Sequence, residues 1–315
     1  MTRSSPSIRR VLVTGGAGFI GSHTVDLLLQ EGKEVVVLDN LSSGKLANLN
    51  LKHPNLEFIE GDVLEYPLIK ELMVGCDAIL HLAAIASVPY SIENPIYSFQ
   101  VNTQGFLHVL QAIKTSSAPI RLVYASSAAV YGYDAQLPCQ DKAPLSGEIL
   151  SPYALQKIHA ENYAHLYARL HGIKSVGLRY FNVYGTRQDP NSSYSGVITH
   201  FLNAYKNETE LTIFGDGEQS RDFIHVSDVA RANLLALNNS YAGVLNIATG
   251  KPRSLLELLN LIRAAGDKPL QSHFAPKRLG DIETSYGAVE MAQHHLNFES
   301  TISLEEGIQC LVGRN

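Results

Sequence analysis

A glycine motif near the start of the chain limits the available folds more than any other feature. Gly15, Gly18 and Gly21 follow a short β-branched run at residues 11–14 and open a helix-compatible run through residue 29. In a strand–turn–helix unit, the first glycine allows a sharp turn, the second lets the backbone approach a pyrophosphate, and the third lets the helix pack closely on the strand. The N–H groups at the start of the helix then point towards the anion. The motif therefore predicts a dinucleotide-binding turn.

Short strand-like runs alternate with helical stretches through the first half of the chain. This alternation is typical of a parallel sheet with helices on both faces. We expect an α/β fold, a Rossmann-type doubly wound parallel sheet with a smaller α/β C-terminal domain. The strands are expected at residues 11–14, 34–38, 56–60, 77–82, 121–126 and 174–180.

Beyond these strands, the signals for helices and domains are sparser. Ser151 and Pro152 form a helix start signal, and a helix is expected over residues 151–171. A second helix is expected over 222–238 with Ser227 as its N-cap, followed by a returning strand at 244–247. The first domain is expected to comprise residues 1–180 and about 219–247, and the second domain residues 181–218 and 248–315.

An acidic residue at the end of the second expected strand indicates which dinucleotide binds. Asp39 stands where a carboxylate can accept both hydroxyls of the adenosine ribose, which favours NAD over NADP. The nearest cation, Lys45, lies six residues further on. Asp62 and Val63 follow the third strand and are expected beside the adenine. The alternative is a tight turn in an unrelated α/β protein, but strand, glycines, helix and acid occur here in order.

A second motif, at residues 153–157, predicts catalysis. Tyr153 and Lys157 are four residues apart on the expected helix, so the phenol and the ammonium share one face. A phenol with a pKa near ~10 is a poor base at neutral pH, but an ammonium and a positive nicotinamide ring favour its anion. We therefore expect Tyr153 to be the acid/base and Lys157 to tune it. Ser127 ends the fifth strand, where it can hydrogen-bond the reacting oxygen. Taken alone, the Tyr153–Lys157 spacing also fits a solvated helix face.

Charge and cysteine content exclude several other classes of protein. A net charge of −5 argues against sequence-independent binding of nucleic acid. Cys76, Cys139 and Cys310 are odd in number and widely spaced, so we expect no disulfide framework and no metal site. The apolar run after the basic start is broken at residues 14–16, so we expect no signal peptide, no membrane partner and a cytoplasmic location.

Seven motifs together resemble those of the extended short-chain dehydrogenase/reductases, and within them the UDP-hexose 4-epimerases. In family order they are TGGAGFIG, LDN, LHLAA, SSAAVYG, SPYALQK, LRYFNVYG and RDFIHVSDVA. The resemblance implies an NAD-binding Rossmann domain, a smaller nucleotide-sugar-binding domain and a UDP-sugar substrate. It also implies a homodimer, in which helices near residues 97–114 and 151–170 pair as a four-helix bundle across a two-fold axis.

The resemblance also implies the reaction. Sugar 4,6-dehydratases carry an Asp-Glu pair after a threonine at the end of the fifth strand, because eliminating water needs an acid and a base. Here Ser127 is followed by Ala128 and Ala129, which disfavours dehydration. C4 epimerisation remains. Tyr153 takes the proton of the 4-hydroxyl while hydride passes to NAD, the 4-keto sugar rotates, and hydride returns to the other face.

Specific contacts follow from the same resemblance. Tyr180 is expected at the nicotinamide and Asn182 at the diphosphate, while Gly196, Val197 and Phe214 are expected to flank the uracil. The expected cofactor contacts are Gly15, Gly18, Phe19, Ile20, Gly21, Asp39, Asn40, Asp62, Val63, Leu82, Ala83, Ala84, Asn102, Tyr153, Lys157 and Tyr180. The expected substrate contacts are Ser87, Ser127, Asn182, Gly196, Val197, Phe214, Arg221, Arg278, Asp281 and Ser285.

Ser285 indicates which hexose is preferred. It lies four residues after Asp281, at the position of a bulky tyrosine in the strict glucose/galactose epimerases. A small side chain leaves room for an acetamido group, and residues 186–191 are similar to epimerases that prefer N-acetylated hexosamines. We therefore expect interconversion of UDP-N-acetylglucosamine and UDP-N-acetylgalactosamine, with UDP-glucose and UDP-galactose as a slower pair. An alignment shifted by one residue would place Tyr286 there and reverse this expectation.

Two other functions fit parts of the pattern. A UDP-glucuronate epimerase or decarboxylase shares the family motifs, although the epimerase usually has threonine at the position of Asn182. A non-catalytic dinucleotide sensor shares the fold, but such proteins often lack the tyrosine and lysine that are present here as Tyr153 and Lys157.

Overall fold

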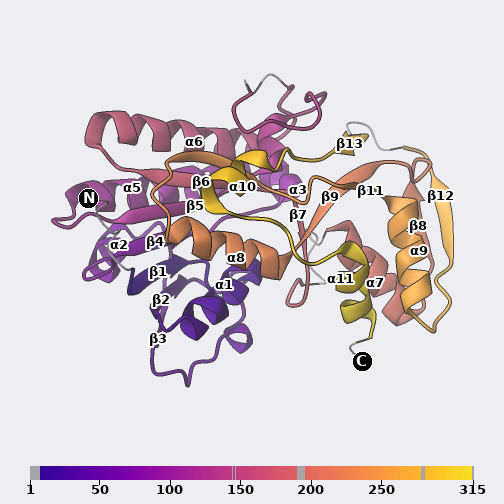
Figure 1. Ribbon diagram of the computed structural model, residues 1–315, viewed down its shortest axis with the longest axis horizontal. Helices are drawn as coiled ribbons and strands as arrows, with labels where there is room; N and C mark the ends of the chain where they lie inside the picture. Colours follow the sequence, from indigo (N-terminus) through magenta and orange to yellow (C-terminus); the bar gives the residue numbers. More distant parts are fainter. Residues whose placement is uncertain (1–7, 144, 146, 190–195, 278–280, 314–315) are drawn as a thin grey trace.

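A seven-stranded parallel sheet forms the centre of the larger part of the molecule in this computed structural model (Figure 1). The structure describes residues 8–143, 145, 147–189, 196–277 and 281–313. Every pairing within the sheet is parallel. In spatial order its strands are β10 (Gly243–Ile247), β6 (Ser175–Tyr180), β5 (Arg121–Ser127), β4 (Ala78–His81), β1 (Arg10–Thr14), β2 (Glu34–Asp39) and β3 (Leu56–Glu60).

This sheet confirms the expected Rossmann-type fold. The six expected strands are present within a residue or two of their predicted ends, and the returning strand is β10, which pairs with β6. The chain order runs outward in both directions from β1, towards β3 on one side and towards β10 on the other. In doubly wound sheets, ligands bind at the carboxyl ends of the strands beside such a reversal.

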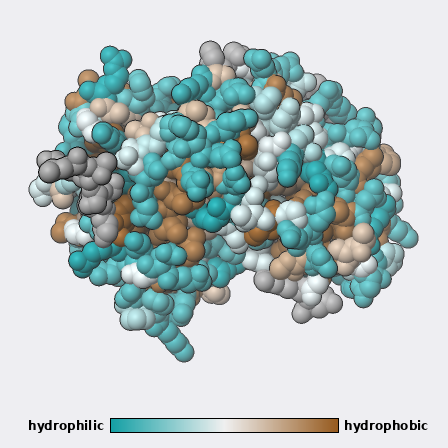
Figure 2. Space-filling model, viewed as in Figure 1, coloured by the Kyte–Doolittle hydropathy of each residue, from teal (hydrophilic) through white to brown (hydrophobic). Residues whose placement is uncertain are grey.

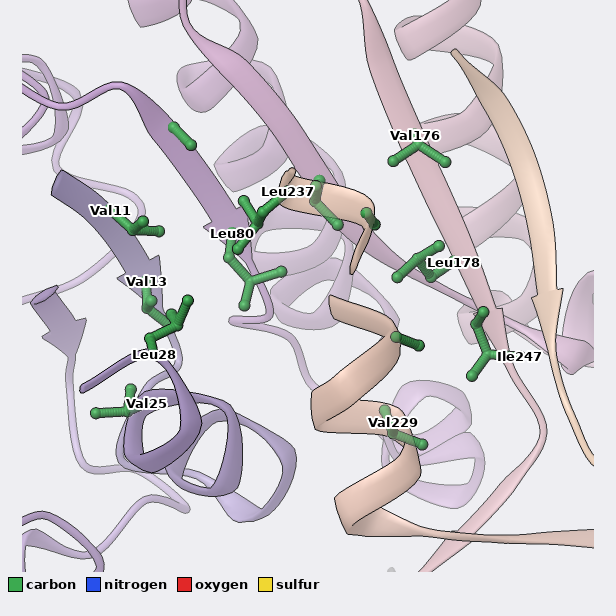
Figure 3. Packing of buried hydrophobic residues seen from close by; sticks show 14 of the residues in the cluster. Val11, Val13, Val25, Leu28, Leu80, Val176, Leu178, Val229, Leu237 and Ile247 are labelled. Carbon is green, nitrogen blue, oxygen red and sulfur yellow. The ribbon is translucent and has the colours of Figure 1, made fainter. Parts of the chain in front are cut away.

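Helices cover both faces of the sheet because each strand buries side chains on both sides. Val11 and Val13 contribute to one core and Leu12, between them, to the other. Figure 3 shows the first core, in which Val25 and Leu28 of one helix lie towards Val11 and Val13, and Leu237 and Val229 of another lie towards Leu80 and Ile247. This face is covered by α1 (Phe19–Gln30), α8 (Val226–Leu237) and α10 (Glu290–Leu296). The opposite face is covered by α2 (Tyr66–Leu72), α5 (Gly105–Thr115) and α6 (Pro152–His171).

A smaller lobe lies beside the carboxyl ends of the central strands (Figure 1). Its core packs two small sheets against three helices, two of which begin with capping boxes, at Ser254 and Ser303. Its helices are α7 (Val197–Asn207), α9 (Leu255–Ala265) and α11 (Leu304–Val312), and its strands are β7 (Asn182–Tyr184), β8 (Leu211–Phe214), β9 (Ser220–His225), β11 (Pro252–Ser254), β12 (Ser272–Ala275) and β13 (Thr284–Ser285). Within residues 219–247, β9 joins the small sheet, while α8 and β10 pack on the large one.

The helix expected over residues 222–238 is wrong for its first four residues. These residues belong to β9, and α8 begins only at Val226. Phe223 and Ile224 are both buried. Their strand, β9, pairs with β7 and β11, so these two apolar residues form part of a sheet and not of a helix. The N-cap is His225, whose side chain accepts a hydrogen bond from the backbone N–H of Ser227.

Short helical segments complete the fold. Two helices and a π-helical turn lead into α5: α3 (Val88–Glu93), α4 (Pro95–Phe99) and residues Gln100–Gln104. Two 3₁₀ turns are Leu46–Asn48 and Ala128–Tyr131. Among the described residues, no helix is both long enough and apolar enough to cross a lipid bilayer. Hydrophilic residues cover most of the face shown in Figure 2, and apolar residues gather there in smaller groups.

Candidate active site

A cavity of about 630 Å³ lies at the carboxyl ends of the central strands and extends to residues of the smaller lobe. Its size suits a small-molecule site. The expected residues that line it are Gly15, Gly18, Phe19, Ile20, Gly21, Asp39, Asn40, Asp62, Val63, Leu82, Ala83, Ala84, Ser127, Tyr153, Lys157, Tyr180, Asn182, Gly196 and Val197. The fold thus gathers segments from Gly15 to Phe223, 208 residues apart in sequence, around one cavity.

The turn between β1 and α1 needs glycine for steric reasons. Gly15 has a φ of +72°, and a Cβ there would lie 2.7 Å from the backbone nitrogen of Ala83. A Cβ on Gly21 would lie 2.1 Å from the carbonyl oxygen of Gly15, so α1 packs tightly on the turn. Gly18 is the N-cap of α1 and provides no side-chain acceptor for the first N–H groups. This geometry fits a pyrophosphate held by backbone donors.

Asp39 ends β2 beside this turn, and its side chain is held in place by the backbone. Its carboxylate accepts hydrogen bonds from the N–H groups of Ala17 and Leu41, both at 2.9 Å. Burial raises the pKa of Asp39, and these backbone donors oppose the shift. Lys45, the nearest cation downstream, forms an ion pair with Asp189 at 3.0 Å. The fixed Asp39 carboxylate fits the role of acceptor for the ribose hydroxyls of NAD.

The helix α6 carries the tyrosine and the lysine to the cavity wall. Ser151 caps it as expected, accepting from the N–H of Ala154. Tyr153 and Ser127 both line the cavity, and Ser127 lowers the pKa of the Tyr153 hydroxyl. The Lys157 Nζ donates to the carbonyl oxygen of Ala125 at 2.8 Å and lies 5.7 Å from the centroid of the Tyr153 ring. Phenol, hydroxyl and ammonium therefore meet at the end of β5.

Burial decides the protonation of this group. It raises the pKa of Tyr153, while the hydrogen bond from Ser127 lowers it. It lowers the pKa of Lys157 to about 8, against the opposing effect of Glu161. His81, which bonds Thr14 at 2.8 Å, has its pKa lowered to about 3 by burial and by Lys157. His81 is therefore neutral.

Two expected contact residues have structural partners instead of facing the cavity. The Asn102 side chain forms two hydrogen bonds with the backbone of Ile85, accepting from the N–H at 2.8 Å and donating to the carbonyl at 3.0 Å. It also donates to the side chain of Gln156. Ile85 itself lines the cavity, so Asn102 shapes the wall from behind. Ser87 is buried as the N-cap of α3, where it accepts from the N–H of Tyr90.

Four further residues expected at the substrate belong to the smaller lobe, outside the cavity lining. Arg221 on β9 forms an ion pair with Asp281 at 2.9 Å, and burial lowers its pKa. Ser285 on β13 is the Cα partner of Arg221, so these three residues lie together. Phe214 ends β8, paired with β12 in the other small sheet. Arg278 lies outside the described residues.

Sequence reasoning missed several residues of the cavity wall. Tyr90 and Tyr97 contribute from α3 and α4, Phe181 follows Tyr180, and Gln188 comes from the loop before α7. No local pattern marks the two tyrosines, because which helix face meets the cavity depends on how α3 and α4 pack against α6. Phe181 had a signal, since it lies inside the motif that contains Tyr180 and Asn182.

Residues 11–248 match the family model described as the NAD dependent epimerase/dehydratase family. A putative UDP-glucose 4-epimerase of Methanocaldococcus jannaschii is 39% identical over 304 residues, which cover 96% of this chain and 97% of that protein.

Two solved structures are similar over nearly the whole chain. One is a UDP-N-acetylglucosamine 4-epimerase from Methanobrevibacter ruminantium in complex with UDP-N-acetylmuramic acid, with 38% identity, coverage of 98% of each chain and a TM-score of 0.90. The other is a UDP-glucose 4-epimerase from Thermus thermophilus in complex with NAD, with 36% identity, coverage of 96% of this chain and 97% of that chain and a TM-score of 0.86.

Proposed function

The chain belongs to the NAD-dependent epimerase/dehydratase family, and from this premise we propose that it catalyses the C4 epimerisation of a UDP-hexose with NAD as cofactor. The observation that carries the proposal is the meeting of Tyr153, Ser127 and Lys157 on the wall of a cavity that fits a dinucleotide. Ala128 and Ala129 follow Ser127, so the acid–base pair needed for dehydration is not supplied there.

Each residue of this group has a chemical role that its geometry supports. The Tyr153 hydroxyl removes the proton from the 4-hydroxyl of the sugar and later returns it. Ser127, which lines the cavity with Tyr153 and lowers its pKa, bonds the same sugar oxygen and orients it. Lys157, fixed by the carbonyl of Ala125, stabilises the tyrosinate electrostatically. NAD, when bound, supplies the hydride acceptor and a positive ring that further favours the anion.

The glycine turn and Asp39 are proposed to hold the cofactor. The first N–H groups of α1 would bind the pyrophosphate, and the Asp39 carboxylate would accept the ribose hydroxyls. Asp62 and Val63 would contact the adenine, and Tyr180 the nicotinamide. The carboxylate at Asp39 and the ion pair of Lys45 with Asp189 both favour NAD over a cofactor with a 2′-phosphate.

We propose UDP-N-acetylglucosamine and UDP-N-acetylgalactosamine as the preferred pair. Ser285 is small, and it lies beside Arg221, which is proposed to bind the diphosphate. One similar structure is itself a UDP-N-acetylglucosamine 4-epimerase.

Product analysis of the purified protein tests this proposal. The protein is incubated with UDP-N-acetylglucosamine or UDP-glucose without added NAD, and the epimers are separated by chromatography. We expect the galacto epimer chiefly from the acetylated substrate. Ser285→Tyr should selectively lose that activity, while Ser285→Ala, which keeps the side chain small, should retain it. Equal effects of both variants on both substrates would contradict the gatekeeper role of Ser285.

We also propose that the protein is a homodimer and acts in the cytoplasm. Apolar side chains are exposed on α3, α4 and α6, including Ile96 at 77% and Leu170 at 63% exposure, and a partner copy would cover them. The three cysteines are free, as a reducing compartment allows. Sedimentation should show a dimer for the wild type and a monomer for Ile96→Glu. Leu51→Glu, at an exposed site away from these helices, is the control that should stay dimeric.

A further inference from the structure

A buried carboxylate lies one helical turn beyond the catalytic lysine. Tyr153, Lys157 and Glu161 are spaced four residues apart on α6, so all three project from one face of the helix. The Glu161 side chain is only 9% exposed. A carboxylate so deeply buried is costly unless it is paired and hydrogen-bonded, so its partners indicate what holds it there.

Those partners come from two adjacent strands of the central sheet. Glu161 Oε1 accepts a hydrogen bond from the Ser126 hydroxyl at 2.6 Å and another from Arg179 Nε at 2.9 Å. Its Oε2 accepts from Arg179 Nη2 at 2.7 Å. The pair is bidentate, the arrangement that gives an arginine–carboxylate contact the most directional strength. Glu161 thereby ties α6 to the ends of both β5 and β6.

The arginine of this pair is itself immobilised. Arg179 is 4% exposed, and its Nη1 donates to the Tyr131 hydroxyl at 2.8 Å and to the carbonyl oxygen of Asp141 at 3.1 Å. Its guanidinium also lies over the Tyr131 ring, 4.8 Å from the centroid. Arg179 is therefore fixed in position, and it fixes the position of the Glu161 carboxylate in turn.

Three consecutive residues of β5 match the three aligned positions of α6. The carbonyl of Ala125 accepts from Lys157 and the hydroxyl of Ser126 donates to Glu161, while Ser127, the next residue, lowers the pKa of Tyr153. Tyr153 and Lys157 act on the substrate only if this register is kept. Of the three contacts, only that of Glu161 is anchored by a buried ion pair.

We propose that Glu161 is a positioning residue for the reaction: paired with Arg179, it fixes Ser126 and the register of α6 on β5, so that Tyr153, Ser127 and Lys157 keep their reactive geometry. This inference rests on the proposed epimerase function. Glu161 need not touch substrate or cofactor, because its effect passes through Ser126 and Lys157. Its negative charge also opposes the effect of burial on the pKa of Lys157.

Four other ionisable groups near Lys157 add no negative charge that would raise its pKa as Glu161 does. His81 on β4 is neutral, because burial and Lys157 lower its pKa to about 3. Tyr124 on β5 is also neutral, since burial and Glu161 raise its pKa well above the usual range. Tyr153 on α6 has a raised pKa as well. Arg179 on β6 is neutralised by Glu161 itself.

Steady-state kinetics of Glu161→Gln test the inference. Glutamine keeps the shape of the side chain but accepts on one oxygen only and carries no charge. We expect kcat to fall by about 100-fold, as for a small misplacement of reacting groups, with the KM for the UDP-sugar changed by no more than about threefold. In a crystal structure of the variant with NAD, the Ser126 hydroxyl should have moved away from residue 161, and Lys157 Nζ away from the carbonyl of Ala125.

Two further variants separate positioning from stability. Glu161→Gln alone leaves a buried arginine unpaired, so it should lower the thermal midpoint. In Glu161→Gln combined with Arg179→Met neither member of the buried pair carries a charge, and the midpoint should recover while kcat stays low. Asp228→Asn is the matched control, because Asp228 is a buried, arginine-paired carboxylate away from the cavity. It should lower the midpoint without changing kcat.

Several results would overturn the inference. An unchanged kcat in Glu161→Gln would do so, as would recovery of kcat together with the midpoint in the double variant. If the wild type epimerised no UDP-sugar, the proposed function would fail instead. The positioning role would then be decided by the crystal structures, where unmoved Ser126 and Lys157 side chains would reject it.

Discussion

Replacing Lys157 by methionine is expected to stabilise the protein while removing its activity. The lysine is 7% exposed, and burial lowers its pKa from 10.5 to about 8. A charged group whose folded-state pKa is depressed costs stability at neutral pH. The difference between the two values corresponds to about 3 kcal/mol. Methionine fills a similar volume without a charge, but it leaves the carbonyl of Ala125 without its Lys157 donor, which costs about 1 kcal/mol. The net gain is about 2 kcal/mol.

The sign of the pH dependence follows from linkage. Between pH 8 and 10.5 the unfolded chain binds a proton at Lys157 that the folded chain has released, so wild-type stability rises with pH across this window relative to the variant. Below pH 8 the full cost is present, and above 10.5 it vanishes. The advantage of the variant should therefore be largest near neutral pH and should shrink as the pH rises.

Thermal unfolding of both proteins at several pH values, with NAD removed, measures this effect, because bound cofactor would add its own binding free energy. At neutral pH the thermal midpoint of Lys157→Met should exceed that of the wild type by roughly 4 °C, and its kcat should be lost. Lys114→Met, on the neighbouring helix α5, serves as a control for the substitution itself. A variant no more stable than wild type, or a difference independent of pH, would refute the burial argument.

Other substitutions test the remaining parts of the site. Tyr153→Phe should lower kcat by about 1,000-fold while NAD stays bound, because it removes only the acid/base; residual turnover equal to wild type in a chromatographic assay would contradict this role. Gly21→Ala places a Cβ 2.1 Å from the Gly15 carbonyl, so it should cost about 1–3 kcal/mol and weaken NAD binding; denaturation and cofactor content measure both. Asp39→Asn removes one carboxylate acceptor, so NAD affinity by calorimetry should fall about tenfold or more, and an unchanged affinity would argue against a ribose contact.

The large sheet could be predicted because its signals are local. Each strand is a short β-branched run bounded by glycine or polar residues, and α6 begins with Ser151 and Pro152. The end of β9 could not be predicted, because Phe223 and Ile224 fit either a helix or a strand until their sheet partners are known. The pairing of β8 with β12 joins segments about 60 residues apart, and neither sequence specifies the other.

The site divides in the same way. Motif spacing indicated Tyr153, Lys157 and Ser127 because catalysis requires these groups at a strand end and on one helix face. It could not indicate that Asn102 bonds Ile85 behind the cavity wall, since an amide's partner depends on what packs against it. Nor did it show Glu161, whose partner Arg179 reads as an ordinary residue of a strand.

Asp222 explains why the volume at residue 285 should matter. It follows Arg221 on β9, and its buried carboxylate accepts from the N–H and hydroxyl of Thr249 at 2.8 and 2.7 Å. It also accepts from the N–H of Gly287, two residues after Ser285, at 3.4 Å. The Asp222 side chain therefore links the backbone next to Arg221 with the backbone two residues after Ser285. A bulky residue at 285 could not be relieved by backbone movement, so its effect on a larger substrate should be steric and selective.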